Sequence, residues 1–397
     1  MDGSASVSPE KVLSLEQQVA RLQALLEASR QVHSAMLVNE VLTQTARILV
    51  RELEMEGALF LEPSSDAPVA SYGDLPAAPY ENCCRYTLVS KENQPLLELV
   101  VAPPAGGELS FYDQDFVEGL VLQTTVALEN ATLHERDLKW ARVQQDLDAA
   151  RSVQSSLLPR EMPEIPAFSI AGRSTACYEV GGDYMDTMRL ADGSHLMVVA
   201  DVAGKGLASA IVACSFRSAM RSLAGQLLPL DGLATRLNQQ HYEDGTQAQL
   251  RYVTAAFVRL HAERAEIEIV NAGHNPAALV RPDGSVVMVN ASGTPLGMLP
   301  GMSYEVERFD FPAGSRILLY TDGLTEVFHG ASEFEEEFGT ERLVAAFRGH
   351  PSRQADHILN FLWETLGEFS QNAPQRDDMT ALVICHLDSS AQECATV

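Results

Sequence analysis

The apolar positions near the start of the chain repeat with the spacing of a helix. Four of them recur at intervals of three and four residues, namely Leu15, Val19, Leu22 and Leu26. A second amphipathic segment extends from Val41 to Leu53. Because the residues before Lys11 are small and polar, we expect them to be disordered. The pattern therefore predicts residues 1–26 as a disordered start followed by a short helix.

The spacing then changes to that of short strands. The predicted strands are 58–61, 85–90 and 96–101. Segments such as 63–68, which begins and ends with proline, separate these strands and cannot continue a strand ladder. Residues 27–111 are therefore predicted to form a separate α+β module.

The segment 112–158 is predicted to be one long helix, because it contains no proline and a single glycine. Its apolar residues form two series with a seven-residue spacing: Val126, Leu133, Trp140 and Leu147, and then Val143, Ala150 and Leu157. This heptad seam predicts a coiled-coil linker that pairs two copies into a homodimer. Glu129 and Arg136 interrupt the seam, so a helix packed on its own domain is the alternative. Pro159 and Pro163 end the helix.

Beyond this helix, short β-rich runs alternate with turn residues. The predicted strands are 196–200, 252–260, 266–271, 277–281, 286–290, 316–320 and 380–386, and the predicted helices are 208–224, 230–240, 341–347 and 353–369. Many strands with a few long helices predict two packed sheets flanked by helices. We expect this domain to span residues 159–388, with a tail at 389–397.

Composition narrows the possible partners and the location. The chain of 397 residues has 54 acidic and 28 basic residues, a formal net charge of −26. This excess argues against nucleic acid and anionic membranes, because both are bound through lysine and arginine. No apolar run approaches the ~18 residues of a spanning helix, and the start lacks the features of a targeting segment. The six cysteines form no CxxC pair, so we expect a reduced, cytoplasmic location.

Aspartates beside turns at the ends of predicted strands are the candidate chemical groups. They occur at four places in the C-terminal part and are Asp183, Asp201, Asp322 and the pair Asp377 and Asp378. A single Asp-Gly after a strand is usually only a turn. Four such places are harder to explain, because an unpaired buried carboxylate costs several kcal/mol and only Lys205 and Arg376 lie nearby in sequence. Oxygen donors in this number suit Mg²⁺ or Mn²⁺ rather than zinc.

Such a group of acids predicts a specific chemistry. Two divalent ions about 3.5–4 Å apart can lower the pKa of a water held between them and present it for in-line attack on phosphorus. The sequence has neither a GxSxG motif nor a P-loop, since the lysine of Gly204-Lys205-Gly206 lacks the upstream glycine spacing. His274 lies in a turn-rich segment, where we expect it to brace a loop. The residues alone therefore predict metal-assisted hydrolysis of a phosphoester.

Six segments resemble a known family in their order along the chain. They are Val180-Gly-Gly-Asp-Tyr-Met-Asp186, Ala200-Asp-Val-Ala-Gly-Lys-Gly206, Asn271-Ala-Gly-His-Asn-Pro276, Gly293-Thr-Pro-Leu-Gly297, Leu318-Leu-Tyr-Thr-Asp-Gly-Leu-Thr-Glu326 and Arg376-Asp-Asp-Met-Thr380. Together they resemble the bacterial PPM/PP2C-type serine phosphatases of the stage II sporulation protein E and sigma-B regulator class. The resemblance covers about residues 145–388.

The resemblance implies an α-β-β-α sandwich that binds two Mn²⁺ or Mg²⁺ ions and removes phosphate from serine or threonine of a protein. The implied substrate is a phosphorylated STAS-type anti-sigma-factor antagonist. By position, the resemblance implies that Asp201 bridges both ions and that the Val202 carbonyl binds one of them. It also implies Asp322 and Asp377 on the first ion and Asp183 on the second. Asp183, Asp201, Asp322 and Asp377 are thus the expected catalytic residues. Whether Asp377 or Asp378 is the ligand stays open, and the phosphate-binding arginine of the eukaryotic branch has no counterpart.

The module at 27–111 resembles a GAF domain in its helix-first layout and in the strand at 56–62. This resemblance implies a sensor for a small molecule or a protein signal, although a packing and dimerisation module is the alternative. A change in pairing of the long helix would then reach the metal site, with residues 207–228 as the movable element. The alternative function is a non-catalytic PP2C-fold scaffold, or a ligand-sensing dimer, that binds the partner without hydrolysis.

Overall fold

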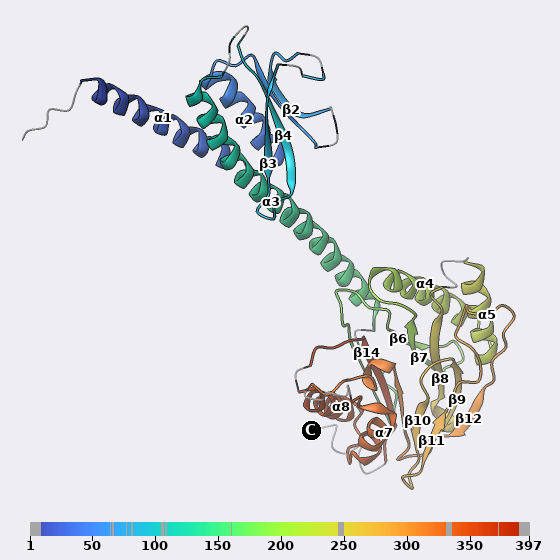
Figure 1. Cartoon of the computed structure of the whole chain (residues 1–397). Helices are drawn as coiled ribbons and strands as arrows, with labels where there is room; N and C mark the ends of the chain where they lie inside the picture. The colour runs from blue at the N-terminus through green and yellow to red at the C-terminus, as the bar shows by residue number, and fades with distance from the viewer. Residues whose placement is uncertain are drawn as a thin grey trace, which may run out of the picture. The chain divides into compact units, whose positions relative to one another are not determined.

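The computed structural model describes residues 9–388, apart from residues 64, 66, 77, 81, 105, 106, 108, 160, 245–249, 331–335 and 372. The predicted disorder at the very start and the predicted tail lie outside the described residues. The chain forms two compact units, Met1–Gln144 and Gln145–Val397, and the division falls inside the long helix (Figure 1). No helix in the described part of the chain is both long and apolar enough to cross a membrane.

The N-terminal unit has a four-stranded antiparallel sheet with helices on one face. Its strands are β1 (Gly57–Leu61), β2 (Pro68–Gly73), β3 (Cys84–Val89) and β4 (Pro95–Ala102), in the order β2-β1-β4-β3. Its helices are α1 (Pro9–His33), α2 (Val38–Glu52) and the first part of α3 (Phe111–Leu157). The core joins these helices to the sheet through buried side chains such as Val41, Phe60, Leu99 and Leu120. This unit is therefore α+β, as predicted.

The first helix extends beyond the predicted boundary at residue 26. α1 continues to His33 because Ala28 and Val32 extend the helical spacing and are buried. The apolar residues that predicted this helix are each more than half exposed, namely Leu15, Val19, Leu22 and Leu26. They are therefore not part of the core of the N-terminal unit.

The C-terminal unit is a sandwich of two five-stranded sheets. One sheet has the order β11-β10-β13-β14-β5 and the other has the order β12-β9-β8-β7-β6. The strands are β5 (Phe168–Thr175), β6 (Tyr184–Arg189), β7 (His195–Val202), β8 (Val253–His261), β9 (Glu266–Ala272), β10 (Ala277–Val280), β11 (Val286–Val289), β12 (Glu307–Asp310), β13 (Arg316–Tyr320) and β14 (Met379–His386). The helices are α4 (Leu207–Ala224), α5 (Leu230–Glu243), α7 (Gly339–Gly349) and α8 (Ala355–Ser370).

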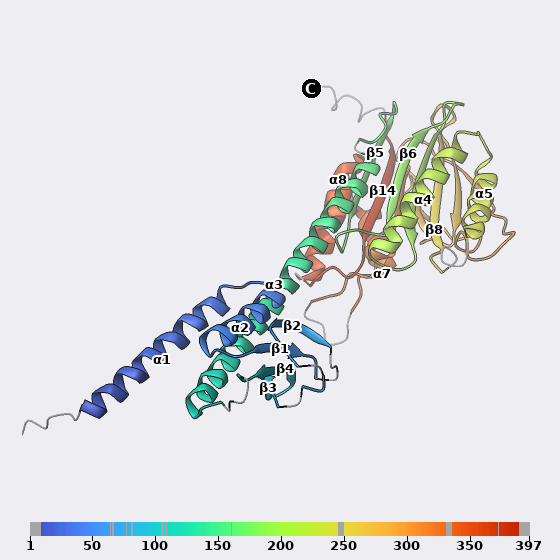
Figure 2. The ribbon, with the colours of Figure 1, turned by 90° about the horizontal axis from the view of Figure 1, so that it is seen from above.

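Three apolar cores hold these layers together. Between the two sheets, side chains such as Val199, Val258 and Ile317 form the central core. α4 and α5 cover the outer face of the β6–β9 sheet, and α7 and α8 cover the outer face of the other sheet (Figure 2). The C-terminal unit is therefore the α-β-β-α sandwich that was expected.

Four strands were missing from the sequence prediction. They are β2, β5, β6 and β12, and each lies at the edge of its sheet. An edge strand needs fewer apolar residues because one side has no strand partner. β12, for example, reads Glu-Arg-Phe-Asp and is largely exposed. In β12 the missing signal was therefore a run of apolar residues.

Candidate metal centre

The registers of the two sheets bring the candidate aspartates to one end of the sandwich. β6 and β7 are antiparallel and pair Tyr184 with Ala200, so Asp183 and Asp201 lie at the same sheet end. β13 and β14 are also antiparallel, so Asp322, after β13, lies near the pair that precedes β14. Thr321 joins the two sheets, because its hydroxyl donates to Asp183 Oδ2 at 2.8 Å.

Asp183 is buried and Asp201 is partly buried, and the pKa values of both carboxyl groups are raised. Burial raises the pKa of Asp183 well above its usual range, and repulsion by Asp201 adds to the effect. Burial also raises the pKa of Asp201 to about 7, with further contributions from Asp322, Asp377 and Asp378. The two carboxylates therefore lie in an environment that disfavours negative charge and favours a bound cation.

Asp322 and Asp377 form the more open side of the group. Asp322 begins a short 3-10 helix, Asp322–Leu324, and burial followed by repulsion from Asp377 raises its pKa. Lys205 Nζ contacts Asp377 Oδ2 at 2.7 Å and donates to the Arg376 carbonyl at 2.7 Å. Lys205 thus supplies one positive charge to this side of the group.

Asp378 has a structural role in this geometry. Its Oδ1 accepts a hydrogen bond from the Cys177 N–H at 2.8 Å, and its Oδ2 accepts one from the Gly182 N–H at 2.7 Å. Both oxygens therefore hold the loop that carries Asp183. Asp377, whose side chain is 30% exposed, is the member of the pair that faces Lys205.

Close packing at Gly182 brings the Val202 carbonyl beside the Asp183 loop. A Cβ atom at Gly182 would lie 2.9 Å from the Val202 oxygen and 3.3 Å from Ser209 Cβ. Only glycine fits this approach without a shift of the backbone. The position of the Val202 carbonyl is thus compatible with the ligand role that the family resemblance implied.

The donors fit hard cations in their chemistry, because they are carboxylates and a backbone carbonyl. Among the described residues, however, no group of three or more His, Cys, Asp or Glu side chains is arranged to hold a metal ion. Two of the acids already have partners, since Asp377 is ion-paired with Lys205 and Asp378 accepts hydrogen bonds from backbone amides. A cation that takes Asp377 as a ligand would have to compete with Lys205.

The site also has a support that sequence reasoning missed. Gln154, near the end of α3, donates from Nε2 to the Gly181 carbonyl at 2.7 Å and accepts from the Gly181 N–H at 3.2 Å. Arg217 of α4 donates to the Leu157 carbonyl at 3.0 Å. The end of the long helix is therefore bonded both to the Asp183 loop and to α4. No spacing rule relates these partners, which lie 27 and 60 residues apart.

His274 braces a loop, as predicted. Its backbone N–H donates to Asn271 Oδ1 at 2.8 Å, and its ring Nδ1 lies 2.8 Å from the Thr254 hydroxyl. Burial lowers the pKa of His274 to about 4, so the ring is neutral at physiological pH. The five cysteines in the described part of the chain form no disulfide.

Comparison with known proteins places the C-terminal unit in a family. Residues 191–387 match the family model described as stage II sporulation protein E. The match contains Asp201, Asp322, Asp377 and Asp378 and begins after Asp183. The fold is also similar to the SiaA-PP2C domain of Pseudomonas aeruginosa, with a TM-score of 0.54 at 22% identity, over 63% of this chain and 99% of that domain.

Two curated relatives extend the similarity in sequence. Protein IcfG of Synechocystis sp. (strain ATCC 27184 / PCC 6803 / Kazusa) is 22% identical over 75% of this chain, and the chain spans only 52% of its length. Phosphoserine phosphatase RsbU of Bacillus subtilis (strain 168) is 24% identical over 75% of this chain and 85% of the relative. With the family match and the shared fold, these similarities show that the C-terminal unit of the chain belongs to the stage II sporulation protein E family of PP2C-type phosphatase domains.

Proposed function

We propose that this chain is a metal-dependent serine/threonine protein phosphatase that dephosphorylates a signalling partner under control of its N-terminal unit. The observation that carries the proposal is the group of aspartates at one end of a PP2C-type sandwich, where burial and mutual repulsion raise the pKa values of Asp183 and Asp201. Buried acids with perturbed pKa values are typical of functional sites.

In this proposal, Asp183, Asp201, Asp322, Asp377 and the Val202 carbonyl hold two Mn²⁺ or Mg²⁺ ions. When bound, the ions would activate a water for attack on the phosphoester. Asp378 and Gln154 position the loop of Asp183, and Thr321 orients the Asp183 carboxylate. The buried strands behind these residues keep the acids in place.

The proposed substrate is a phosphorylated STAS-type anti-sigma-factor antagonist, as the family resemblance implies. The relative RsbU is itself named a phosphoserine phosphatase, which supports this class of reaction. We further propose that the N-terminal unit is GAF-like and receives a small-molecule or protein signal, and that the chain acts in the cytoplasm as a homodimer. Leu133, Trp140 and Val143 of the predicted seam are 49–64% exposed in the single chain, which leaves them available to a second copy.

Hydrolysis assays test the proposed function directly. We expect the full chain to hydrolyse p-nitrophenyl phosphate and a phosphoserine peptide in Mn²⁺ or Mg²⁺, and to lose this activity in EDTA. Restoration of activity by adding the metal back is the control for irreversible damage. Binding of a phosphorylated partner without hydrolysis in either metal would instead support the non-catalytic scaffold.

Removal of the Gln154 side chain should weaken metal binding, because Gln154 supports the loop that carries Asp183. In Gln154→Ala, the Gly181 backbone loses both hydrogen bonds to α3. We expect the Mn²⁺ concentration for half-maximal activity to rise by about tenfold, the low end for loss of a group that supports a ligand. The matched control is Gln145→Ala, an exposed glutamine of the same helix. An equal Mn²⁺ dependence of the two variants would argue against a link from α3 to the site.

A further inference from the structure

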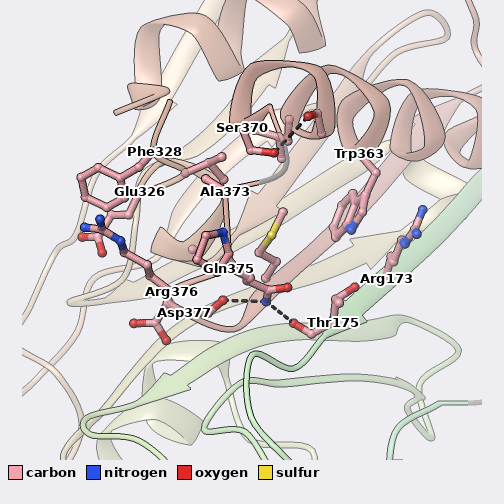
Figure 3. Close-up of a pocket in the computed structure, with 16 residues that line it drawn as sticks. Arg173, Thr175, Glu326, Phe328, Trp363, Ser370, Ala373, Gln375, Arg376 and Asp377 are labelled. Carbon is pink, nitrogen blue, oxygen red and sulfur yellow. Dashed lines mark hydrogen bonds between the residues drawn. The ribbon is translucent and has the colours of Figure 1, made fainter. Parts of the chain in front are cut away.

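A pocket of about 260 Å³ lies beside the candidate metal centre, between β5, α8 and the segments that follow β13 and precede β14 (Figure 3). Asp377 and Gly323 belong to its lining, so it adjoins the aspartate group. Its apolar lining includes Val327, Trp363, Leu366 and Met379. The proposed reaction leaves this pocket unused.

Two arginines lie on opposite sides of the pocket, each against an aromatic ring (Figure 3). The guanidinium carbon of Arg173 is 4.9 Å from the centroid of the Trp363 ring, and that of Arg376 is 4.0 Å from the centroid of the Phe328 ring. Stacking on Trp363 restricts the Arg173 side chain and leaves its edge available for a carboxylate. In a chain with a net charge of −26, two arginines at one pocket are a local exception.

The two acids of the pocket do not cancel this charge. Asp377 is already ion-paired with Lys205. Glu326 is close enough to Asp322, Glu337 and Asp377 to be repelled by them. One of the two arginine charges therefore has no matching carboxylate within the pocket, and Arg173 lies on the side away from Glu326 (Figure 3).

The pocket is also fixed to the metal centre. Gln375 Nε2 donates to the Thr175 carbonyl at 2.9 Å and to the Asp377 carbonyl at 2.7 Å, as the dashed lines in Figure 3 show. The end of β5, which carries Arg173, is thereby tied to the segment that carries Asp377. A protein chain with its phosphate at the aspartate group would place neighbouring residues over this pocket.

We infer that this pocket binds the residues next to the phosphoserine of the protein substrate, with an apolar side chain against Trp363 and Leu366 and a carboxylate on Arg173. The inference rests on the proposed function and adds a source of sequence selectivity to it. A substrate phosphate held mainly by cations would give little discrimination among phosphoproteins. A pocket that combines an apolar surface with a fixed positive charge would provide this discrimination.

A charge reversal tests this inference. The substrates are two phosphoserine peptides with leucine next to the phosphoserine, one with glutamate and the other with lysine at the following position. We expect the full chain to prefer the glutamate peptide, and Arg173→Glu to shift the ratio of the two kcat/KM values by about tenfold towards the lysine peptide, equivalent to about 1.4 kcal/mol. A damaged fold would lower both values alike and leave the ratio unchanged. Arg189→Glu, at an exposed arginine outside the pocket, is the matched control.

Fluorescence provides a second readout that does not need turnover. The chain has two tryptophans, so Trp140→Phe leaves Trp363 as the only one. We expect the glutamate peptide to change Trp363 emission saturably, and Arg173→Glu to weaken this binding. An unchanged peptide ratio in a variant that still hydrolyses p-nitrophenyl phosphate like the wild type, or a Trp363 signal that does not respond to peptide, would overturn the inference. If the wild type hydrolysed neither peptide, the phosphatase proposal would be contradicted. The Trp363 fluorescence titration would still decide whether the pocket binds the peptide.

Discussion

Asp201→Asn should abolish phosphatase activity and, in the absence of metal, make the protein more stable. Asp201 is the acid that interacts with Asp322, Asp377 and Asp378, so the proposed metal site depends on it most. Metal ions stabilise the transition state by several kcal/mol. Without them we expect kcat/KM to decrease by about a thousandfold or more. The assay is hydrolysis of p-nitrophenyl phosphate in Mn²⁺.

The gain in stability follows from the same crowding of charge. Without a cation, Asp201 is partly buried and is repelled by other acids, and asparagine removes one of the charges. We expect the melting temperature in EDTA at pH 8 to rise, with a change in free energy of about 2–4 kcal/mol. Mn²⁺ should raise the melting temperature of the wild type and have no such effect on the variant. Asp310→Asn, at an exposed acid of β12, should change neither activity nor melting temperature. Wild-type activity in Asp201→Asn would refute the metal assignment.

The pH dependence of this stability difference has a definite sign. The pKa of Asp201 is about 7 in the folded chain and about 3.9 in an unfolded one. The folded state therefore binds the Asp201 proton more tightly than the unfolded state does. Below about pH 4 the carboxyl is protonated in both states and does not reduce the stability, and above about pH 7 the destabilisation by the carboxylate is complete. The advantage of Asp201→Asn in EDTA should grow across this window. His274, with a pKa lowered to about 4, has the opposite sign but is common to both proteins and cancels in the difference.

The central strands and the aspartates could be predicted from the sequence because their signals are local. A buried strand such as β14 needs a continuous apolar run, and the acids stand directly before or after such runs. Edge strands such as β12 carry no such signal, and propensity alone does not find them. The family resemblance supplied the order of the motifs, but it left the choice between Asp377 and Asp378 open.

Long-range contacts are the part that no local pattern predicts. Asp378 accepts hydrogen bonds from residues about 200 positions earlier in the chain, and these bonds support the Asp183 loop. Gln154 is one of several glutamines in a polar helix, and only the folded chain brings it to Gly181. The extent of α1 was also underestimated, because small buried residues such as Ala28 continue it.

The anchoring of α4 gives the largest expected loss of stability. Asp186 of β6 is fully buried, and Arg221 of α4 donates to both of its oxygens at 2.6 Å. The Tyr184 hydroxyl and the Thr187 N–H complete its hydrogen bonds. Arg221→Met would leave the carboxylate buried without its cation. Because the Arg221 side chain is 40% exposed, we expect a loss of about 2–3 kcal/mol, less than the value for a fully buried pair.

A comparison of variants isolates this contact. Urea unfolding followed by Trp363 emission, in the Trp140→Phe background, reports on the C-terminal unit, since Trp363 lies in its α8. Arg308→Met, which removes an exposed ion pair with Glu268, should cost less than about 1 kcal/mol. The double variant Asp186→Leu and Arg221→Met should recover part of the loss, because no charge is then left buried. Equal effects of Arg221→Met and Arg308→Met would contradict the anchor. Since α4 follows the Asp201 strand, release of its far end should also change the Mn²⁺ dependence of activity if α4 is the movable element of the switch.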